Sequence, residues 1–135
     1  MPLARAGYEP GTRQFAWPVR GEVISFFGSK FDRSKNKGID IMCSIDTDVR
    51  ASHAGKVVFC DDKFKGYGKT VIIDHGNDFQ TVYAYNSSIL VKVGDAVEQN
   101  SVIARSGRSG RAKVPSLHFE IRRSGEGVNP LSYLS

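Results

Sequence analysis

A short stretch near the C-terminus alternates strictly between apolar and polar residues, and this alternation constrains the fold more than any other feature. Residues 116–122 read Ser-Leu-His-Phe-Glu-Ile-Arg. Successive side chains of a β-strand point to opposite faces, so the three apolar residues share one face. The opposite face carries the four polar residues Ser116, His118, Glu120 and Arg122. We therefore expect a strand with one face in the core and the other face on the floor of a groove.

The rest of the chain predicts an all-β domain. Runs that favour strands follow one another at short spacing, with glycine-rich turns between them and without a convincing amphipathic helix or a repeat. The expected strands are residues 22–27, 38–43, 49–51, 55–61, 69–74, 79–85, 101–105 and 116–122. Residues 1–14 are small, polar and basic, and we expect a flexible lead-in there, with the domain covering residues 15–135.

One hairpin is predicted in more detail than the other elements. Residues 69–74 should pair with residues 79–85 across the turn His75-Gly76-Asn77-Asp78. Thr81, Tyr83 and Tyr85 alternate along the second strand and should share a face, so that at least one tyrosine faces the groove. His75 in this turn and His53 in a polar turn are expected to be solvated surface residues.

Composition restricts the class of partner. A chain of 135 residues with 40% hydrophobic and 24% charged residues is long and apolar enough to bury a core, which argues against disorder. The net charge of +5 favours an anionic partner such as nucleic acid, lipid headgroups or bacterial cell wall. The basic residues are spread along the chain and are not clustered with exposed aromatic residues, which argues against nucleic acid.

The cysteines and the apolar runs exclude several classes. Cys43 and Cys60 are too far apart to form a redox or zinc CxxC element; they are either two separate buried thiols or one bridge between neighbouring strands. No run approaches the length of a membrane span, and the N-terminus lacks a signal-peptide pattern. The chain is therefore expected to be either cytosolic or a domain of a longer exported protein.

Several stretches, in order, resemble the LytM-type domain of the M23 zinc metallopeptidase family. They are Trp17-Pro18-Val19-Arg20-Gly21, Lys37-Gly38-Ile39-Asp40-Ile41, Gly55-Lys56-Val57-Val58, Gly66-Tyr67-Gly68, Thr81-Val82-Tyr83-Ala84-Tyr85-Asn86, Val93-Gly94-Asp95, residues 117–122 and Val128-Asn129-Pro130. The resemblance covers residue 15 to the end. It implies a compact duplicated hybrid (barrel-sandwich) fold of short, mostly antiparallel strands with an open groove.

The resemblance also locates the positions that carry the chemistry of active members. Their zinc ligands come from an HxxxD motif and an HxH motif, and further histidines assist catalysis. Here Asp40 and His118 remain, whereas Asn36, Ser116 and Tyr85 stand where the family has histidines. A catalytic zinc needs three protein ligands and an open position for water. We therefore expect no metal, no cofactor and no catalysis. Ser116 and His118 share a face, as a serine nucleophile and its base would. No glycine-rich oxyanion turn precedes Ser116, so we do not expect this pair to act as a nucleophile.

Loss of catalysis with retention of the fold is similar to one branch of the family, the murein hydrolase activators of the EnvC and NlpD type, of which the EnvC type matches more closely. The resemblance implies a periplasmic, cell-envelope domain that binds and activates a zinc-dependent N-acetylmuramoyl-L-alanine amidase during cell division. The expected groove residues are Lys37, Tyr67, Tyr85, His118 and Arg122, with Asn36, Asp40 and Ser116 on the floor. The alternatives are a peptidoglycan-binding envelope scaffold without an amidase partner and a residual zinc endopeptidase.

Overall fold

The computed structural model describes residues 14–31 and 34–135, and its regular structure is β-strand apart from one short 3-10 turn, η1 (Pro130–Ser132). The all-β prediction is confirmed. The strands are β1 (Val23–Ser25), β2 (Lys30–Phe31), β3 (Ser34–Lys35), β4 (Ile39–Met42), β5 (Asp48–Arg50), β6 (Gly55–Asp61), β7 (Lys69–Gly76), β8 (Phe79–Ile89), β9 (Ala96–Val97), β10 (Val102–Ser106), β11 (Ser116–Arg123) and β12 (Glu126–Val128). The expected flexible lead-in lies outside the described residues except for Gln14.

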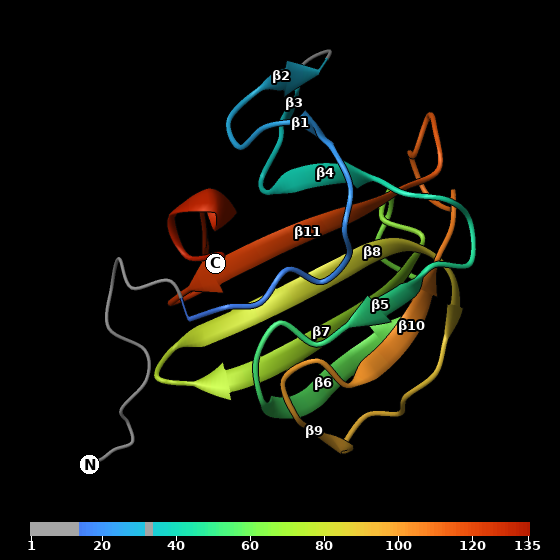
Figure 1. Ribbon diagram of the computed structural model, residues 1–135. Coiled ribbons are helices and arrows are strands. Elements are labelled where there is room, and N and C mark those ends of the chain that lie inside the picture. Colours follow the sequence, from blue (N-terminus) through green and yellow to red (C-terminus); the bar gives the residue numbers. More distant parts are fainter. Residues whose placement is uncertain (1–13, 32–33) are drawn as a thin grey trace.

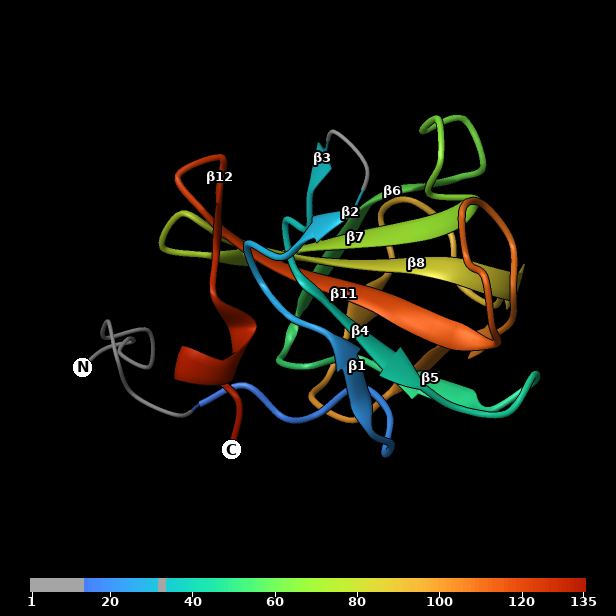
Figure 2. The ribbon, with the colours of Figure 1, turned by 90° about the horizontal axis from the view of Figure 1, so that it is seen from above.

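Ten of these strands form one antiparallel sheet, with β11 in its interior. The order along the main path is β1-β4-β11-β8-β7-β6-β9, while β10 pairs with β5 and β8, and β12 pairs with β11. Figure 1 shows β11 crossing the molecule between β4 and β8. Seen from above, β1 and β4 lie on one side of β11 and β7 and β8 lie on the other (Figure 2). The predicted strand over residues 116–122 is therefore an interior strand of the sheet, with β4 and β8 as its neighbours.

The core lies on the apolar face of the central strands. Leu117, Phe119 and Ile121 of β11 are fully buried, and so are Ile39 and Ile41 of β4. Both sets alternate with polar residues, so each strand buries one complete row of apolar side chains against the rest of the core cluster. Burial of such side chains supplies the main favourable free energy of folding, about 1.5–3 kcal/mol for each large apolar residue.

The predicted hairpin forms, but its turn is tighter than expected. Strand β7 extends through His75 to Gly76, and the chain reverses at Asn77 and Asp78, both of which have positive φ angles of 51° and 68°. His75 is consequently part of a strand and is only 8% exposed. The prediction of a solvated His75 is wrong, because the tight turn draws the residue back into the sheet.

The buried His75 ring is stabilised by one hydrogen bond that it donates and one that it accepts. Its Nδ1 donates to the carbonyl of Ala54 at 2.8 Å, and its Nε2 accepts from Thr81 Oγ1 at 2.7 Å. Thr81 in turn contacts the hydroxyl of Tyr83 at 2.6 Å, and that hydroxyl accepts from the Ser52 amide at 2.9 Å. Burial lowers the pKa of His75 to about 4, so the ring is neutral at physiological pH.

The first and last described segments lie together. Phe15 forms a parallel bridge with Leu134, and the Ser135 amide donates to the Phe15 carbonyl at 3.0 Å. Cys43 and Cys60 are free, half-buried thiols, so the two-thiol alternative is the one observed. Across the described stretches, no helix has the length and apolar character needed to cross a bilayer.

Candidate functional site

The register between β4 and β11 places Asp40 beside His118. The two residues are directly paired across the strands, and the His118 Nδ1 lies 2.7 Å from the Asp40 Oδ1. Gly38, just before β4, permits this approach, because a Cβ atom there would lie 2.1 Å from the carbonyl oxygen of Phe119. The motif Lys37-Gly38-Ile39-Asp40 therefore has a structural reason for its glycine, which is close contact with the central strand.

Glu120 holds the other side of the His118 ring. The His118 Nε2 donates to Glu120 Oε2 at 2.8 Å, and the Arg122 Nε donates to Glu120 Oε1 at 2.9 Å. The hydroxyl of Tyr67 also donates to Glu120 Oε2. The Glu120 side chain is completely buried, and its charge is matched by His118 and Arg122.

The two carboxylates favour the protonated form of His118. Burial by itself lowers the pKa of His118, but the hydrogen bonds and charges of Asp40 and Glu120 outweigh burial and raise that pKa. Burial likewise raises the pKa of Glu120, and the His118, Tyr67 and Arg122 partners outweigh it and lower that pKa. Both ring nitrogens of His118 are therefore donors, and Asp40, His118, Glu120 and Arg122 form one chain of alternating charge.

Tyr85 reaches the groove through a bulge in β8. The pairs Lys69–Asn86 and Val71–Tyr83 enclose one residue on β7 but two on β8. Tyr85 is the extra residue, has a φ angle of 71°, and lies with its ring 5.4 Å from that of His118. Tyr83 is buried in the core beside Phe119. The prediction that Tyr83 and Tyr85 share a face is wrong, because alternation breaks at the bulge.

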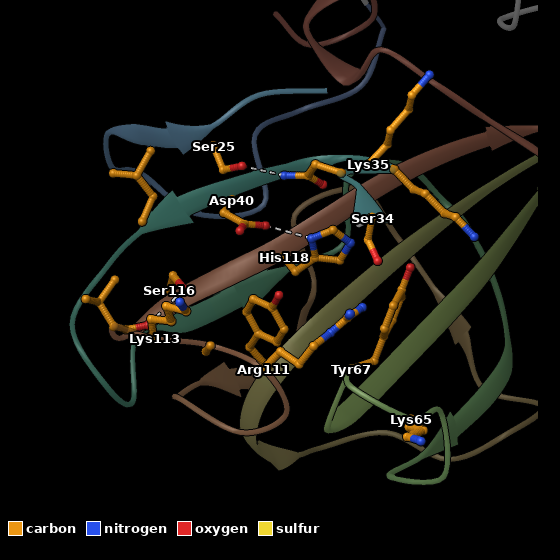
Figure 3. A pocket seen from close by; sticks show the side chains of 16 residues that line it. Ser25, Ser34, Lys35, Asp40, Lys65, Tyr67, Arg111, Lys113, Ser116 and His118 are labelled. Atoms are coloured by element: carbon orange, nitrogen blue, oxygen red, sulfur yellow. Dashed lines mark hydrogen bonds and ion pairs between the residues drawn. The ribbon is translucent and has the colours of Figure 1, made fainter. Parts of the chain in front are cut away.

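These elements enclose a groove with a volume of about 550 Å³. Among the predicted site residues, seven line it: Asn36, Lys37, Asp40, Tyr67, Tyr85, Ser116 and His118. Arg122 does not line it and instead supports Glu120 from below. Figure 3 shows Arg111 and Tyr67 extending toward His118 from the side opposite Asp40.

The tyrosines of the groove present neutral hydroxyl groups. Burial, followed by the charge of Asp40, raises the pKa of Tyr85 to about 12. Burial and the hydrogen bond to Glu120 raise the pKa of Tyr67 as well. The two rings pack at 5.4 Å and 5.1 Å from the His118 ring, so they offer flat apolar area with a polar tip.

Sequence reasoning missed two sets of residues. Glu120 received no role, although its position two residues from His118 on the same face of the strand was a usable signal. The second set consists of basic residues from separate parts of the chain that line the groove together: Lys35, Lys65, Arg111 and Lys113. No sequence signal links these four residues, because the distances between them are set by the sheet.

The donor set does not fit a catalytic zinc ion. Both nitrogens of His118 are donors to carboxylates, whereas a metal ligand needs a free nitrogen lone pair. Asn36 is also engaged, because its Oδ1 accepts from the Gly38 amide at 2.9 Å and its Nδ2 donates to Ser25 Oγ at 2.8 Å. Over residues 14–31 and 34–135, no group of three or more His, Cys, Asp or Glu side chains is placed to hold a metal ion.

The fold and the groove define a member of a known class. The sequence pattern of peptidase family M23 matches residues 34–130, and the chain belongs to this family. A crystal structure of a zinc-containing peptidase from Vibrio cholerae superimposes with a TM-score of 0.79 at 28% identity, covering 87% of this chain and 39% of that one. The predicted family and fold are confirmed.

Two curated relatives place the chain more narrowly within the family. The lipoprotein NlpD/LppB homolog of Pseudomonas aeruginosa is 41% identical over 93% of this chain and 41% of its own length. The murein hydrolase activator EnvC of Escherichia coli is 41% identical over 90% of this chain and 29% of its own length. The predicted resemblance to both types is confirmed, and these two identities do not separate them. The chain spans less than half of each relative.

Proposed function

We propose that this chain is a non-catalytic M23 domain that binds and activates a peptidoglycan amidase of the N-acetylmuramoyl-L-alanine type. The name of the EnvC relative, a murein hydrolase activator, supports the activating role. The observation that carries the non-catalytic part is the double engagement of His118 between Asp40 and Glu120. A ring held in this way neither binds a metal nor accepts a proton from water.

The groove is suited to binding and not to chemistry. Its floor is a closed chain of ion pairs, and its walls carry the rings of Tyr67 and Tyr85. Aromatic side chains beside a fixed polar floor provide most of the affinity in many protein interfaces. Activation follows if the groove binds a segment of the amidase that is exposed only in the active state, because a ligand shifts an equilibrium by its differential affinity.

The compartment belongs to the same proposal. One relative is named a lipoprotein and another a murein hydrolase activator, which supports the cell envelope and specifically the periplasm as the site of action. The zinc ion and the hydrolysis then belong to the amidase. Segments outside this domain supply any anchoring and any contact with the division machinery.

A dye-release assay on purified sacculi tests the proposal. The domain alone, a periplasmic amidase alone and their mixture are compared, and release is expected only in the mixture. Tyr85→Ala should abolish this gain. Leu90→Ala, which truncates an exposed side chain outside the groove, should preserve it. Chelator-sensitive release by the domain alone would support the residual endopeptidase instead.

A peptidoglycan-binding envelope scaffold is the second candidate, and the basic residues around the groove favour it. Stem peptides of the cell wall carry carboxylates that such residues can bind. Pull-down on sacculi, compared with titration against an amidase, separates the two functions. Retention on sacculi without any effect on a competent amidase would favour the scaffold.

A further inference from the structure

Basic side chains surround the mouth of the groove. They come from three separate parts of the chain: β3 and the residues after it, the connection between β6 and β7, and the loop that precedes β11. They are Lys35, Lys37, Lys65, Arg111 and Lys113, and all five are exposed. The sheet therefore brings together cations that are up to 78 residues apart in the sequence, which is the separation of Lys35 and Lys113.

The floor does not neutralise these cations. Among the described residues that line the groove, Asp40 is the only acidic one, and its carboxylate already accepts from His118. Glu120 beneath it is matched by His118 and Arg122. Within the part of the chain that the structure describes, no ion pair includes Lys35, Lys37, Lys65 or Arg111. The charged groups of the floor thus pair with one another, and the positive charges of Lys35, Lys37, Lys65 and Arg111 are available to a ligand.

The same groove also exposes apolar surface. Ile24 on β1 and Val114 before β11 each leave 41% of their surface exposed and line the groove. The rings of Tyr67 and Tyr85 add further apolar area. Exposed large apolar side chains beside exposed cations match a ligand that carries both apolar side chains and carboxylates. Peptidoglycan stem peptides have small side chains, so they satisfy the cations but not the apolar wall.

We propose that the groove receives an acidic, amphipathic peptide segment of the activated amidase. Its carboxylates pair with the rim lysines and Arg111, and its apolar side chains lie against Ile24, Val114 and the two tyrosines. This inference rests on the proposed function and adds the chemistry of the bound segment. Charges on a rim act mainly on the rate of association and on its dependence on salt.

Surface-immobilised amidase and the soluble domain provide the test. We expect association to slow as salt rises from roughly 50 to 300 mM, since screening shortens the reach of surface charges over that range. Lys35→Glu and Lys65→Glu should each slow association several-fold at low salt, and the double variant by about tenfold or more. Lys92→Glu makes the same charge change at an exposed site outside the groove and should leave association within about twofold of wild type.

The outcomes separate this inference from the proposed function. If activation persists while association depends neither on salt nor on the Lys35→Glu and Lys65→Glu substitutions, the proposal of an acidic segment is overturned. The activator role then remains intact. The absence of any association or activation at any salt concentration would overturn the activator role itself. If Lys35→Glu and Lys65→Glu reduce retention on sacculi but not amidase binding, the basic residues bind the cell wall. That outcome would also overturn the inference.

Discussion

The Nε2 atom of His118 lies 2.8 Å from a carboxylate oxygen of Glu120, two residues further along the same strand. Glu120 is fully buried and accepts from Tyr67, His118 and Arg122 together. One side chain therefore connects the β6–β7 connection to the central strand. This carboxylate stabilises the floor of the groove through charge pairing.

Replacing Glu120 with glutamine should destabilise the domain. The substitution preserves shape but removes the charge that matches His118 and Arg122, and breaking a buried ion pair of this kind costs about 3 kcal/mol. Urea unfolding of Glu120→Gln against wild type measures the loss. Glu126→Gln, at an exposed site on β12, should change the free energy of unfolding by less than about 0.5 kcal/mol. Equal stability of Glu120→Gln and wild type would contradict the assigned role.

The domain should contain far less than one zinc ion per chain after purification. Asp40 and His118 bind each other, and both amide atoms of Asn36 are engaged. Asn36→His adds an imidazole ligand and should raise the affinity for zinc, although His118 stays engaged. Metal analysis and titration with a zinc-binding dye measure both quantities. Stoichiometric zinc in the wild-type protein would show that the His118–Glu120 contact gives way to a metal.

Acid should destabilise the fold through His75. The folded-state pKa of about 4 lies below the ordinary histidine value of 6.5, so the unfolded chain binds the proton first as the pH falls. Stability is therefore complete above about pH 6.5 and falls toward pH 4, by up to about 3 kcal/mol from this group. Protonation turns the Nε2 atom of His75 into a donor and so removes the acceptor for the Thr81 hydroxyl proton within that hydrogen-bonded chain.

Unfolding curves at several pH values measure this effect. His75→Gln should flatten the dependence between pH 6.5 and pH 4. Burial lowers the pKa of the adjacent His53 as well, so His53→Gln should remove a part of the dependence and leave the larger part in place. A His75→Gln variant with an unchanged pH profile would contradict the assignment.

The bulge at Tyr85 predicts an unusual order of stability. At a φ angle of 71°, alanine is strained by about 1 kcal/mol relative to glycine, so Tyr85→Gly should be more stable than Tyr85→Ala. Both variants lose the ring and should activate an amidase less than wild type. Gln80 lies on the same strand at an ordinary φ, and there the glycine variant should be the less stable one. Thermal melts of the glycine and alanine variants at both positions measure the order of stability at each.

The alternation of residues 116–122 was enough to predict which of their apolar side chains enter the core. Leu117, Phe119 and Ile121 are all buried as expected. The reason is physical, because a period of two is a local property of an extended chain and needs no partner strand. Seven of the eight site residues predicted from the family motifs also line the groove, since motif spacing records which residues must meet.

The tertiary structure alone decided the remaining features. Tyr85 faces the groove only because β8 carries one more residue than β7 between two paired positions. His75 is buried because the turn closes at Asn77 and Asp78. Glu120 connects the groups of the groove floor because the loop that carries Tyr67 covers it, and the Tyr67 hydroxyl donates to its carboxylate. The basic rim exists because three separate parts of the chain meet around the groove. The sequence by itself determined the faces of the strands and the family, since both are local or ordered along the chain. The register, the bulge and the convergence of loops depend on contacts between distant residues, and only the folded sheet fixes those.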